Sequence, residues 1–250
     1  MNVLITGSEG MVGSRLVKYL SRKGYSVTEF KGDVRDIKAW NQYKHSHYNF
    51  LIHLAALAGV RPSFRDPEKY YDHNVNGTKL ALEFGNIHAD EILYASSSNA
   101  YEWWGNPYAT TKKINEVQAM PYNAIGMRFH TIWPGRPDML FQKFKRNEVT
   151  YINTGHYRDF ININDLLSAI EVIMNNFRKL KSERSVYDIG TGHATPVEEV
   201  ANIFNFNGIR QKENPDGERS FTKADIEYLL ELGWTPSYNI LIPDHHKDYE

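Results

Sequence analysis

Cysteine is absent from this sequence of 250 residues, which excludes disulfide bonds, thiol nucleophiles and zinc sites built on cysteine. No apolar run approaches the ~18 residues that span a bilayer, so no membrane partner is expected. Charges balance, with 29 Lys and Arg against 30 Asp and Glu, and nucleic acid is not an expected partner. The 10 histidines are scattered without an accompanying carboxylate or cysteine cluster, so no metal site is expected.

Short apolar strands alternate along the chain with amphipathic helices. The alternation predicts an α/β fold with a doubly wound parallel sheet, and its ligand site at the carboxyl ends of the strands. The expected strands are 2–6, 25–30, 49–55, 91–97, 124–129 and 185–189. The expected helices are 11–23, 67–86, 108–120, 164–177, 196–206 and 222–232.

Both ends of the last helix carry signals, since Thr222 is suited to cap it and Gly233 to end it. Asn164 or Asp165 is expected to cap helix 164–177. The first strand is expected from Asn2, which leaves no room for a signal peptide and favours a cytoplasmic location.

The segment after the first strand has glycine at three positions spaced by three, Gly7, Gly10 and Gly13. Glycine permits positive φ and close approach of the backbone to a ligand. The following helix points unpaired N–H groups and a partial positive charge toward that ligand, which suits a pyrophosphate. The spacing is a variant of the dinucleotide fingerprint and predicts a dinucleotide site.

A second pattern joins Ser97, at the end of an expected strand, to Tyr108 and Lys112 on the helix that follows. Residues four apart lie on the same helix face, so the ammonium is close to the phenol and lowers its pKa. The tyrosine then becomes a plausible general base near neutral pH, with the serine hydroxyl bonding the same substrate oxygen.

With these motifs in place, the chain resembles the extended short-chain dehydrogenase/reductases of the nucleotide-sugar epimerase/dehydratase superfamily, and is most similar to the UDP-glucuronate 4-epimerases. The supporting segments follow the order of that superfamily along nearly the whole chain: 6–13, 53–61, 74–78, 94–98, 108–112, 127–131, 135–139, 158–160 and 232–236. The resemblance implies a Rossmann-type dinucleotide-binding domain, 1–133 plus 161–190, and a small nucleotide-sugar-binding lobe, 134–160 plus 191–250.

The implied activity is that of a nucleotide-sugar 4-epimerase acting on a UDP-uronate or UDP-hexose through transient oxidation at C4. Tyr108 would remove the proton from the sugar O4, Ser97 would hydrogen-bond that oxygen, and Lys112 would tune Tyr108 and hold the nicotinamide ribose. Dehydratases of the superfamily carry an Asp-Glu pair after the catalytic Ser or Thr. Ser98 and Asn99 occupy those positions here, which argues against dehydration.

The resemblance also implies the binding residues. Those for the cofactor are Gly7, Gly10, Met11, Val12, Gly13, Lys31, Asp33, Val34, Leu54, Ala55, Ala56, Asn74, Tyr108, Lys112 and Phe129. Those for the substrate are Arg61, Ser98, Thr131, Arg136, Arg158 and Arg219. Arginine suits the diphosphate and a sugar carboxylate because its planar fork binds such groups in a bidentate way.

The cofactor choice stays open between NAD, which we expect, and NADP. NAD-dependent relatives place an acid at the end of the second strand, whereas this register holds Lys31, which with Arg35 could bind a 2′-phosphate. An NADPH-dependent reductase of a 4-keto nucleotide sugar is therefore one alternative. A catalytically silent dinucleotide-binding protein is another, because several loops are shorter than in relatives.

Two of these shortenings affect the expected site and assembly. The segment 102–107 replaces a longer loop of the relatives. Trp103 and Trp104 in this segment could form a lid or simply pack, and we expect packing. Pro121 truncates the helix that contributes to the dimer interface of relatives, so a homodimer is an uncertain expectation.

Overall fold

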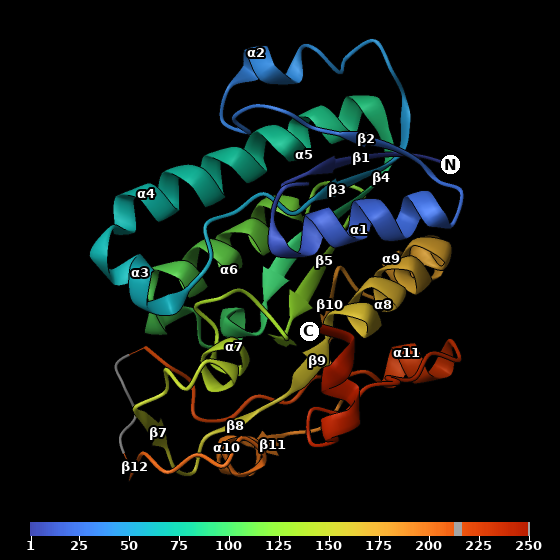
Figure 1. Ribbon diagram of the computed structural model, residues 1–250. Coiled ribbons are helices and arrows are strands. Elements are labelled where there is room, and N and C mark those ends of the chain that lie inside the picture. Colours follow the sequence, from blue (N-terminus) through green and yellow to red (C-terminus); the bar gives the residue numbers. More distant parts are fainter. Residues whose placement is uncertain (213–216, 250) are drawn as a thin grey trace. The chain divides into compact units, whose positions relative to one another are not determined.

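A parallel sheet organises the first of two compact units, residues 1–128 and 176–187. The computed structural model describes residues 1–212 and 217–249 (Figure 1). The six strands follow the order β10-β5-β4-β3-β1-β2, and the registers joining β2, β1, β3 and β4 are parallel. They are β1 (Asn2–Thr6), β2 (Ser26–Glu29), β3 (Tyr48–His53), β4 (Ala89–Ser97), β5 (Ala124–Phe129) and β10 (Val186–Ile189). The expected α/β fold and all six expected strands are confirmed.

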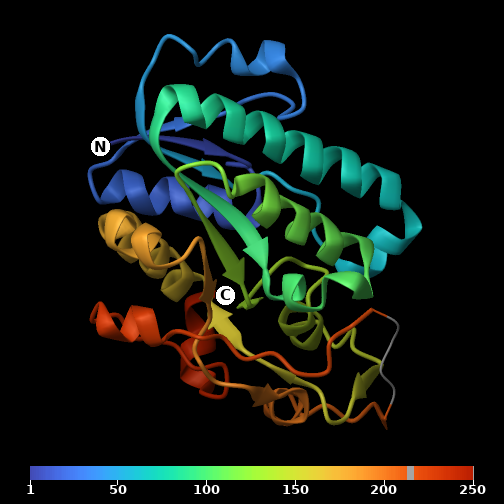
Figure 2. The same cartoon turned by 180° about the vertical axis from the view of Figure 1, so that it is seen from behind.

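Continuous apolar runs form the central strands because helices cover the sheet on both faces. Leu4 and Ile5 in β1, and Leu51 and Ile52 in β3, have no exposed surface. Helices α1 and α9 lie on one side of the sheet and α5 and α6 on the other (Figures 1 and 2). Since the strands are parallel, β1, β3 and β4 bring their carboxyl ends to the same edge.

In this unit, α1 and α6 match the expected helices 11–23 and 108–120, whereas the helix expected over 67–86 is divided into shorter elements. They are α1 (Met11–Arg22), α2 (Ile37–Trp40), α3 (Val60–Arg65), α4 (Pro67–Tyr71), α5 (Gly77–His88), the 3-10 segment η2 (Ser98–Gly105), α6 (Pro107–Ala119) and α9 (Phe177–Glu183). The single helix expected over 67–86 consists of α4, a π-helical turn (Asp72–Asn76) and α5.

The π turn coincides with a buried asparagine. The Asn74 amide accepts from Leu57 N at 2.8 Å, and donates to Leu57 O and to Thr111 Oγ1, each at 3.0 Å. These bonds fix the helix to the chain that follows β3 and to α6. Widened turns of this kind are frequent at functional sites.

The second unit, residues 129–175 and 188–250, is built from short elements packed around aromatic residues. Its strands are β6 (Thr131–Trp133), β7 (Tyr151–Asn153), β8 (Tyr157–Arg158), β9 (Phe160–Asn162), β11 (Thr195–Pro196) and β12 (Ile209–Gln211). Its helices are α7 (Leu140–Lys145), α8 (Ile163–Asn175), α10 (Val197–Ile203), α11 (Glu227–Glu231) and the 3-10 segment η3 (Pro243–Tyr249). Within residues 1–212 and 217–249, none of the helices has the length and apolar character needed to cross a bilayer.

Two expected helix starts in this unit are wrong. The helix expected over 222–232 is only α11, because the Thr222 hydroxyl accepts from Asp159 N at 3.2 Å instead of capping a helix. Helix α8 begins at Ile163, and Asn162 Oδ1 accepts from Asn164 N at 2.8 Å. The Asp165 carboxylate binds the backbone N–H groups of 237 and 238, each at 3.0 Å, so a distant loop uses the side chain expected to cap α8.

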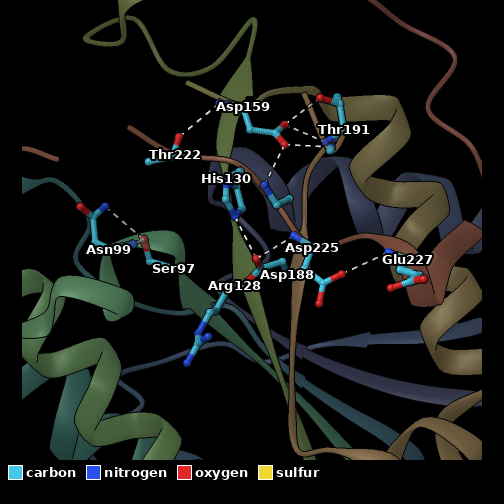
Figure 3. A network of polar contacts seen from close by, with 12 residues as sticks. Ser97, Asn99, Arg128, His130, Asp159, Asp188, Thr191, Thr222, Asp225 and Glu227 are labelled. Carbon is cyan, nitrogen blue, oxygen red and sulfur yellow. Dashed lines mark hydrogen bonds and ion pairs between the residues drawn. The ribbon is translucent and has the colours of Figure 1, made fainter. Parts of the chain in front are cut away.

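A buried carboxylate organises the loops of the second unit. Asp159 is fully buried, and its Oδ1 accepts from Thr191 N at 2.7 Å and from Thr191 Oγ1 at 2.9 Å (Figure 3). Its Oδ2 accepts from Gly192 N at 2.9 Å and from Ala224 N at 3.1 Å. One side chain therefore satisfies four donors from two loops that are far apart in the sequence.

Replacing this carboxylate should destabilise the protein strongly. Asp159→Ala leaves four donors without their acceptor, and a buried donor without a partner costs about 1–3 kcal/mol, so we expect the free energy of unfolding to fall by about 3 kcal/mol or more. Asp159→Asn keeps one acceptor oxygen and should lose less. Urea denaturation measures both.

The matched control is Asp244→Ala, which removes an exposed carboxylate whose ion-pair partner is Lys247. Exposed pairs contribute about 0–1 kcal/mol, so this variant should remain close to the wild type. Equal losses in the two alanine variants would show that Asp159 has no special role.

Candidate active site

The turn after β1 is shaped so that only glycine fits at two positions. Gly7 has φ of 69°, and a Cβ there would lie 2.7 Å from Ala55 N. A Cβ on Gly13 would lie 2.1 Å from Gly7 O. Gly10 precedes α1 and provides no side-chain cap for its first N–H groups. The turn therefore presents backbone donors and a helix N-terminus without side chains in the way, which suits a pyrophosphate.

A buried histidine ties this turn to its neighbours. His53 Nδ1 lies 2.8 Å from Thr6 Oγ1, and Nε2 lies 3.2 Å from Thr78 Oγ1. Burial, and secondarily the charge of Lys112, lowers the pKa of His53 to about 3, so the ring is neutral. The Thr6 hydroxyl also accepts from Ala55 N at 3.3 Å, which positions the segment 54–56 beside the turn.

The Ser97 hydroxyl lies at the end of β4 and serves as an acceptor for one neighbour. Asn99 donates to Ser97 Oγ from its backbone N at 3.2 Å and from Nδ2 at 3.3 Å (Figure 3). With two donors bound to the oxygen, the hydroxyl proton of Ser97 is the group directed outward to a ligand. The sequence alone marks Asn99 only as a missing acid, and nothing in its spacing indicates the bond to Ser97.

Tyr108 is positioned by the start of α6. Asn106 Oδ1 accepts from Ala109 N at 2.8 Å, and Pro107 occupies the first turn, so the helix begins one residue before Tyr108. The Tyr70 ring packs edge-on against Tyr108, with centroids 6.3 Å apart. The helix start therefore positions the backbone of the candidate base, and Tyr70 of α4 packs against its ring.

Lys112 is buried one turn further along α6. Its Nζ donates to Ala95 O at 2.8 Å, which fastens α6 to the end of β4, two residues before Ser97. Burial lowers the pKa of Lys112 from its usual 10.5 to about 8. The structure therefore places Ser97, Tyr108 and Lys112 on two elements that are joined by this bond.

A buried ion pair, which we did not foresee from the sequence, supports the same helix. Glu116 lies one turn after Lys112 and accepts from Arg128 Nε at 2.7 Å and from Arg128 Nη2 at 2.8 Å. Ser96 Oγ donates to the same carboxylate at 2.8 Å. The Arg128 guanidinium also lies over the Tyr101 ring, 4.2 Å from its centroid. The sequence indicates a role for Glu116 only through the spacing of Tyr108, Lys112 and Glu116, which places a polar residue at every fourth position along α6.

The two tryptophans of the loop between β4 and α6 are exposed. Trp103 retains 45% and Trp104 70% of their accessible surface, and they contact each other edge-on. The expectation that they simply pack is wrong. The physical reason is that the loop is short. The 3-10 segment η2 and the hydrogen bond from Thr110 Oγ1 to Trp103 O, at 2.8 Å, hold it in a tight conformation.

Three further candidates for cofactor binding, Lys31, Asp33 and Val34, follow the end of β2. Lys31 pairs with Glu9 and Glu29, and Arg35 pairs with Asp33. Arg35 holds the pKa of Asp33 at about 2. Val34 O accepts from Trp40 Nε1 at 2.8 Å.

The candidates for substrate binding divide between the two units. Arg61 and Ser98 belong to the first, whereas Thr131, Arg136, Arg158 and Arg219 belong to the second, as does the cofactor candidate Phe129. Arg158 donates from Nη1 to Tyr157 O at 2.9 Å and to Ser220 O at 3.2 Å, and burial lowers its pKa. Arg136 is partly exposed and pairs with Asp138 at 3.0 Å. Thr131 N donates to Asp159 O at 2.9 Å.

His130, next to Phe129, has an acidic neighbour in the second unit. Both side chains are buried, and His130 Nε2 lies 3.4 Å from Asp188 Oδ2 (Figure 3). Asp188 Oδ2 also accepts from Asp225 N at 3.1 Å. The sequence alone indicated only a packed histidine at this position.

Comparison with known proteins identifies the family. The model of the NAD dependent epimerase/dehydratase family matches residues 3–118. Protein CapI of Staphylococcus aureus is 30% identical over 270 aligned positions, which cover 85% of this chain and 81% of CapI. UDP-glucuronate 4-epimerase 4 of Arabidopsis thaliana is 25% identical, over 96% of this chain and 72% of the relative.

Solved structures agree with the sequence comparison. MoeE5 in complex with UDP-glucose and NAD superimposes with a TM-score of 0.81 at 27% identity, covering 96% of this chain and 94% of MoeE5. MoeE5 in complex with UDP-glucuronic acid and NAD gives a TM-score of 0.80. With a CapI match across most of both chains and a family model that covers the glycine turn, Ser97, Tyr108 and Lys112, this chain belongs to the NAD dependent epimerase/dehydratase family.

Proposed function

We propose that this protein is a nucleotide-sugar 4-epimerase whose substrate is a UDP-linked uronate or hexose. The observation that carries the proposal is the bond from Lys112 Nζ to Ala95 O, which joins the helix bearing Tyr108 to the strand ending at Ser97. Relatives named as UDP-glucuronate 4-epimerases, and the MoeE5 complexes with UDP-glucose and UDP-glucuronic acid, support the substrate class.

NAD is the cofactor, in keeping with the family. The residues around the glycine turn fit it, because the tight turn admits no side chain at Gly7 or Gly13 and no side chain caps the first N–H groups of α1. When bound, NAD supplies a reversible hydride acceptor for the sugar C4. The backbone from Gly7 to Gly13, with Met11 and Val12 at the start of α1, would hold the pyrophosphate. Further contacts would come from Asp33, Val34, Leu54, Ala55, Ala56, Asn74 and Phe129.

The chain's own residues would move the proton of the sugar O4. Tyr108, as phenolate, accepts that proton, and the neighbouring Lys112 ammonium stabilises the phenolate before the transfer. Ser97 donates its hydroxyl proton in a hydrogen bond to O4, because Asn99 already occupies its oxygen. Return of the proton from Tyr108 to O4 completes the cycle, so the residues end as they began.

The same geometry argues against loss of water from the substrate. Dehydration needs an acid and a base beside the sugar, and the two positions after Ser97 hold Ser98 and Asn99. Asn99 uses its amide to support Ser97. Neither side chain titrates near neutral pH, so this pair can exchange no proton with C5 or O6.

Arginines would hold the charged parts of the substrate. Arg158 and Arg219 are assigned to the diphosphate, and Arg136 with Thr131, or Arg61, to the C6 end of the sugar. In this assignment, residues 1–133 and 161–190 bind the dinucleotide, and residues 134–160 and 191–250 bind the nucleotide sugar. A carboxylate at C6 would favour Arg136, because the guanidinium fork binds carboxylates in a bidentate way; such binding would replace its present pair with Asp138.

Tyr108→Phe should abolish epimerisation and leave cofactor binding intact. Loss of a general base typically costs 10²–10⁴-fold, so we expect kcat to fall by about that factor. Turnover is followed with UDP-glucuronic acid and UDP-glucose by separating the C4 epimers, and bound NAD by its absorbance after denaturation.

The matched control is Tyr19→Phe, because Tyr19 and Lys23 on α1 have the same spacing as Tyr108 and Lys112. This variant should retain wild-type turnover. A Tyr108→Phe protein with undiminished turnover would contradict the assigned role. A wild type that converts no nucleotide sugar would favour the binding protein without catalysis.

The lowered pKa of Lys112 predicts a dependence of stability on pH. Between about 8 and its usual 10.5, the unfolded chain still binds the Lys112 proton and the folded protein has released it. The contribution of Lys112 to the free energy of unfolding therefore rises with pH across this range, by at most about 1.4 kcal/mol per pH unit.

Urea denaturation of the wild type and of Lys112→Met from pH 7 to 10 tests the sign. The difference in unfolding free energy, wild type minus variant, should increase above pH 8. Lys79→Met, at an exposed lysine on α5, should follow the wild-type slope. Parallel slopes for the wild type and Lys112→Met would mean that the buried ammonium titrates normally.

A further inference from the structure

One buried carboxylate on α6 is bonded from three elements. Glu116 is 6% exposed, and its Oε1 accepts from Ser96 Oγ at 2.8 Å and from Arg128 Nε at 2.7 Å. Its Oε2 accepts from Arg128 Nη2 at 2.8 Å and from Lys113 Nζ at 3.2 Å. The carboxylate therefore ties α6 to two adjacent strands of the sheet, to β4 through Ser96 and to β5 through Arg128.

Both members of this pair are charged and held in place. Burial by itself would raise the pKa of the Glu116 carboxyl, but the hydrogen bonds and charge of Arg128 outweigh burial and hold that pKa below its usual value. The Arg128 guanidinium also lies over the Tyr101 ring, 4.2 Å from its centroid, while its fork binds both carboxylate oxygens. Two parallel bonds between charged groups are short and directional, so they define a position as well as an attraction.

These bonds end beside the candidate catalytic residues. Glu116 follows Lys112 by four residues and Tyr108 by eight, so the three side chains run along one side of α6. Ser96, which donates to the carboxylate, is joined covalently to Ser97. A shift of the Glu116 carboxylate would therefore displace the helix that bears the candidate base relative to the strand end that bears the serine.

Stability alone is a poor explanation for this buried ion pair. Removing two charges from water is costly, and apolar side chains of similar size often give equal or greater stability at such positions. Apolar contacts have no directional bonds, whereas the guanidinium fork fits a carboxylate in one geometry. The property that the Glu116–Arg128 pair adds is thus a defined position of α6 against β4 and β5.

We propose that Glu116 and Arg128 are positioning residues of the epimerase reaction, whose bonds hold the general base and its serine partner at the spacing that the sugar O4 requires. The inference rests on the proposed function and adds two residues to it. In this role neither residue touches the substrate, and both act through Tyr108 and Ser97. The requirement is strict, because reacting atoms must lie about 3–3.5 Å apart and a displacement of about 1 Å can lower the rate about 100-fold.

The test replaces the ion pair by apolar side chains of similar size, in the double variant Glu116→Leu/Arg128→Met. This variant should fold, retain NAD and have a free energy of unfolding close to or above that of the wild type, because no charge is left buried alone. Its kcat should fall at least about tenfold, with KM within about threefold of the wild type. The contacts that bind the substrate are unchanged, and only the reacting geometry is disturbed.

Glu116→Gln provides a milder second variant, because it keeps the shape of the side chain and one acceptor oxygen. Its kcat should fall about three- to tenfold at unchanged KM. In the Tyr108→Phe background, the same substitution should lower the residual kcat by no more than about twofold, since the base that it positions is gone. A loss caused by partial unfolding would instead be equal in the two backgrounds.

The matched control is Lys79→Met/Glu83→Leu, which makes the same exchange at an exposed ion pair on α5. This variant should keep the kcat, KM and NAD content of the wild type. Urea denaturation and circular dichroism measure the stability and folding of every variant.

The results distinguish this inference from the function on which it rests. A folded apolar double variant with wild-type kcat, a change in KM alone, or a kcat loss that only follows the loss of folded protein would overturn the positioning role and leave the epimerase proposal standing. If the double variant does not fold, Glu116→Gln decides by the same criteria. A folded wild type that converts no nucleotide sugar would overturn the proposed function, and this inference with it.

Discussion

The burial of one ammonium group holds the candidate active site together. The Lys112 ammonium is buried away from water and donates one hydrogen bond, to the Ala95 carbonyl near the end of β4. Because the buried charge needs that acceptor, the hydrogen bond fixes the position of helix α6 against the strand. The arrangement is costly, since desolvation lowers the pKa of the group to about 8. The buried Glu116–Arg128 pair beside it provides a second attachment between α6 and the sheet. Burial of Lys112 therefore lowers the free energy of unfolding, and the neighbouring Glu116–Arg128 pair offsets part of that loss. Such a trade between stability and activity is common at catalytic sites.

The sequence was a reliable guide wherever local physics decides the outcome. Short apolar runs predicted all six strands of the sheet, and the glycine spacing predicted the turn before α1, where the structure leaves no room for a Cβ at Gly7 or Gly13. The bond that joins Lys112 to β4 could not be read from spacing, because it depends on the packing of α6 against a strand 17 positions earlier. The roles of the substrate-binding residues remain predictions.

Sequence reasoning failed where a side chain serves a partner distant along the chain. Thr222 resembles a helix cap, yet its hydroxyl binds Asp159 N, 63 positions away. Asp165 resembles a cap for α8, yet it binds a loop more than 70 positions later. The π turn at Asn74 coincides with hydrogen bonds to Leu57 and Thr111, which no local pattern encodes. For Thr222 and Asp165, a tertiary hydrogen bond replaces the local one that the residue type favours.

The exposed tryptophans of the shortened loop give the molecule a built-in optical reporter. Of its five indoles, those at positions 40, 133 and 234 are buried, whereas Trp103 and Trp104 face solvent. A dissolved quencher such as iodide would reach only the exposed pair, so the quenchable part of the emission comes from the segment between Ser97 and Tyr108. Events beside the candidate base can therefore be followed without attaching a dye.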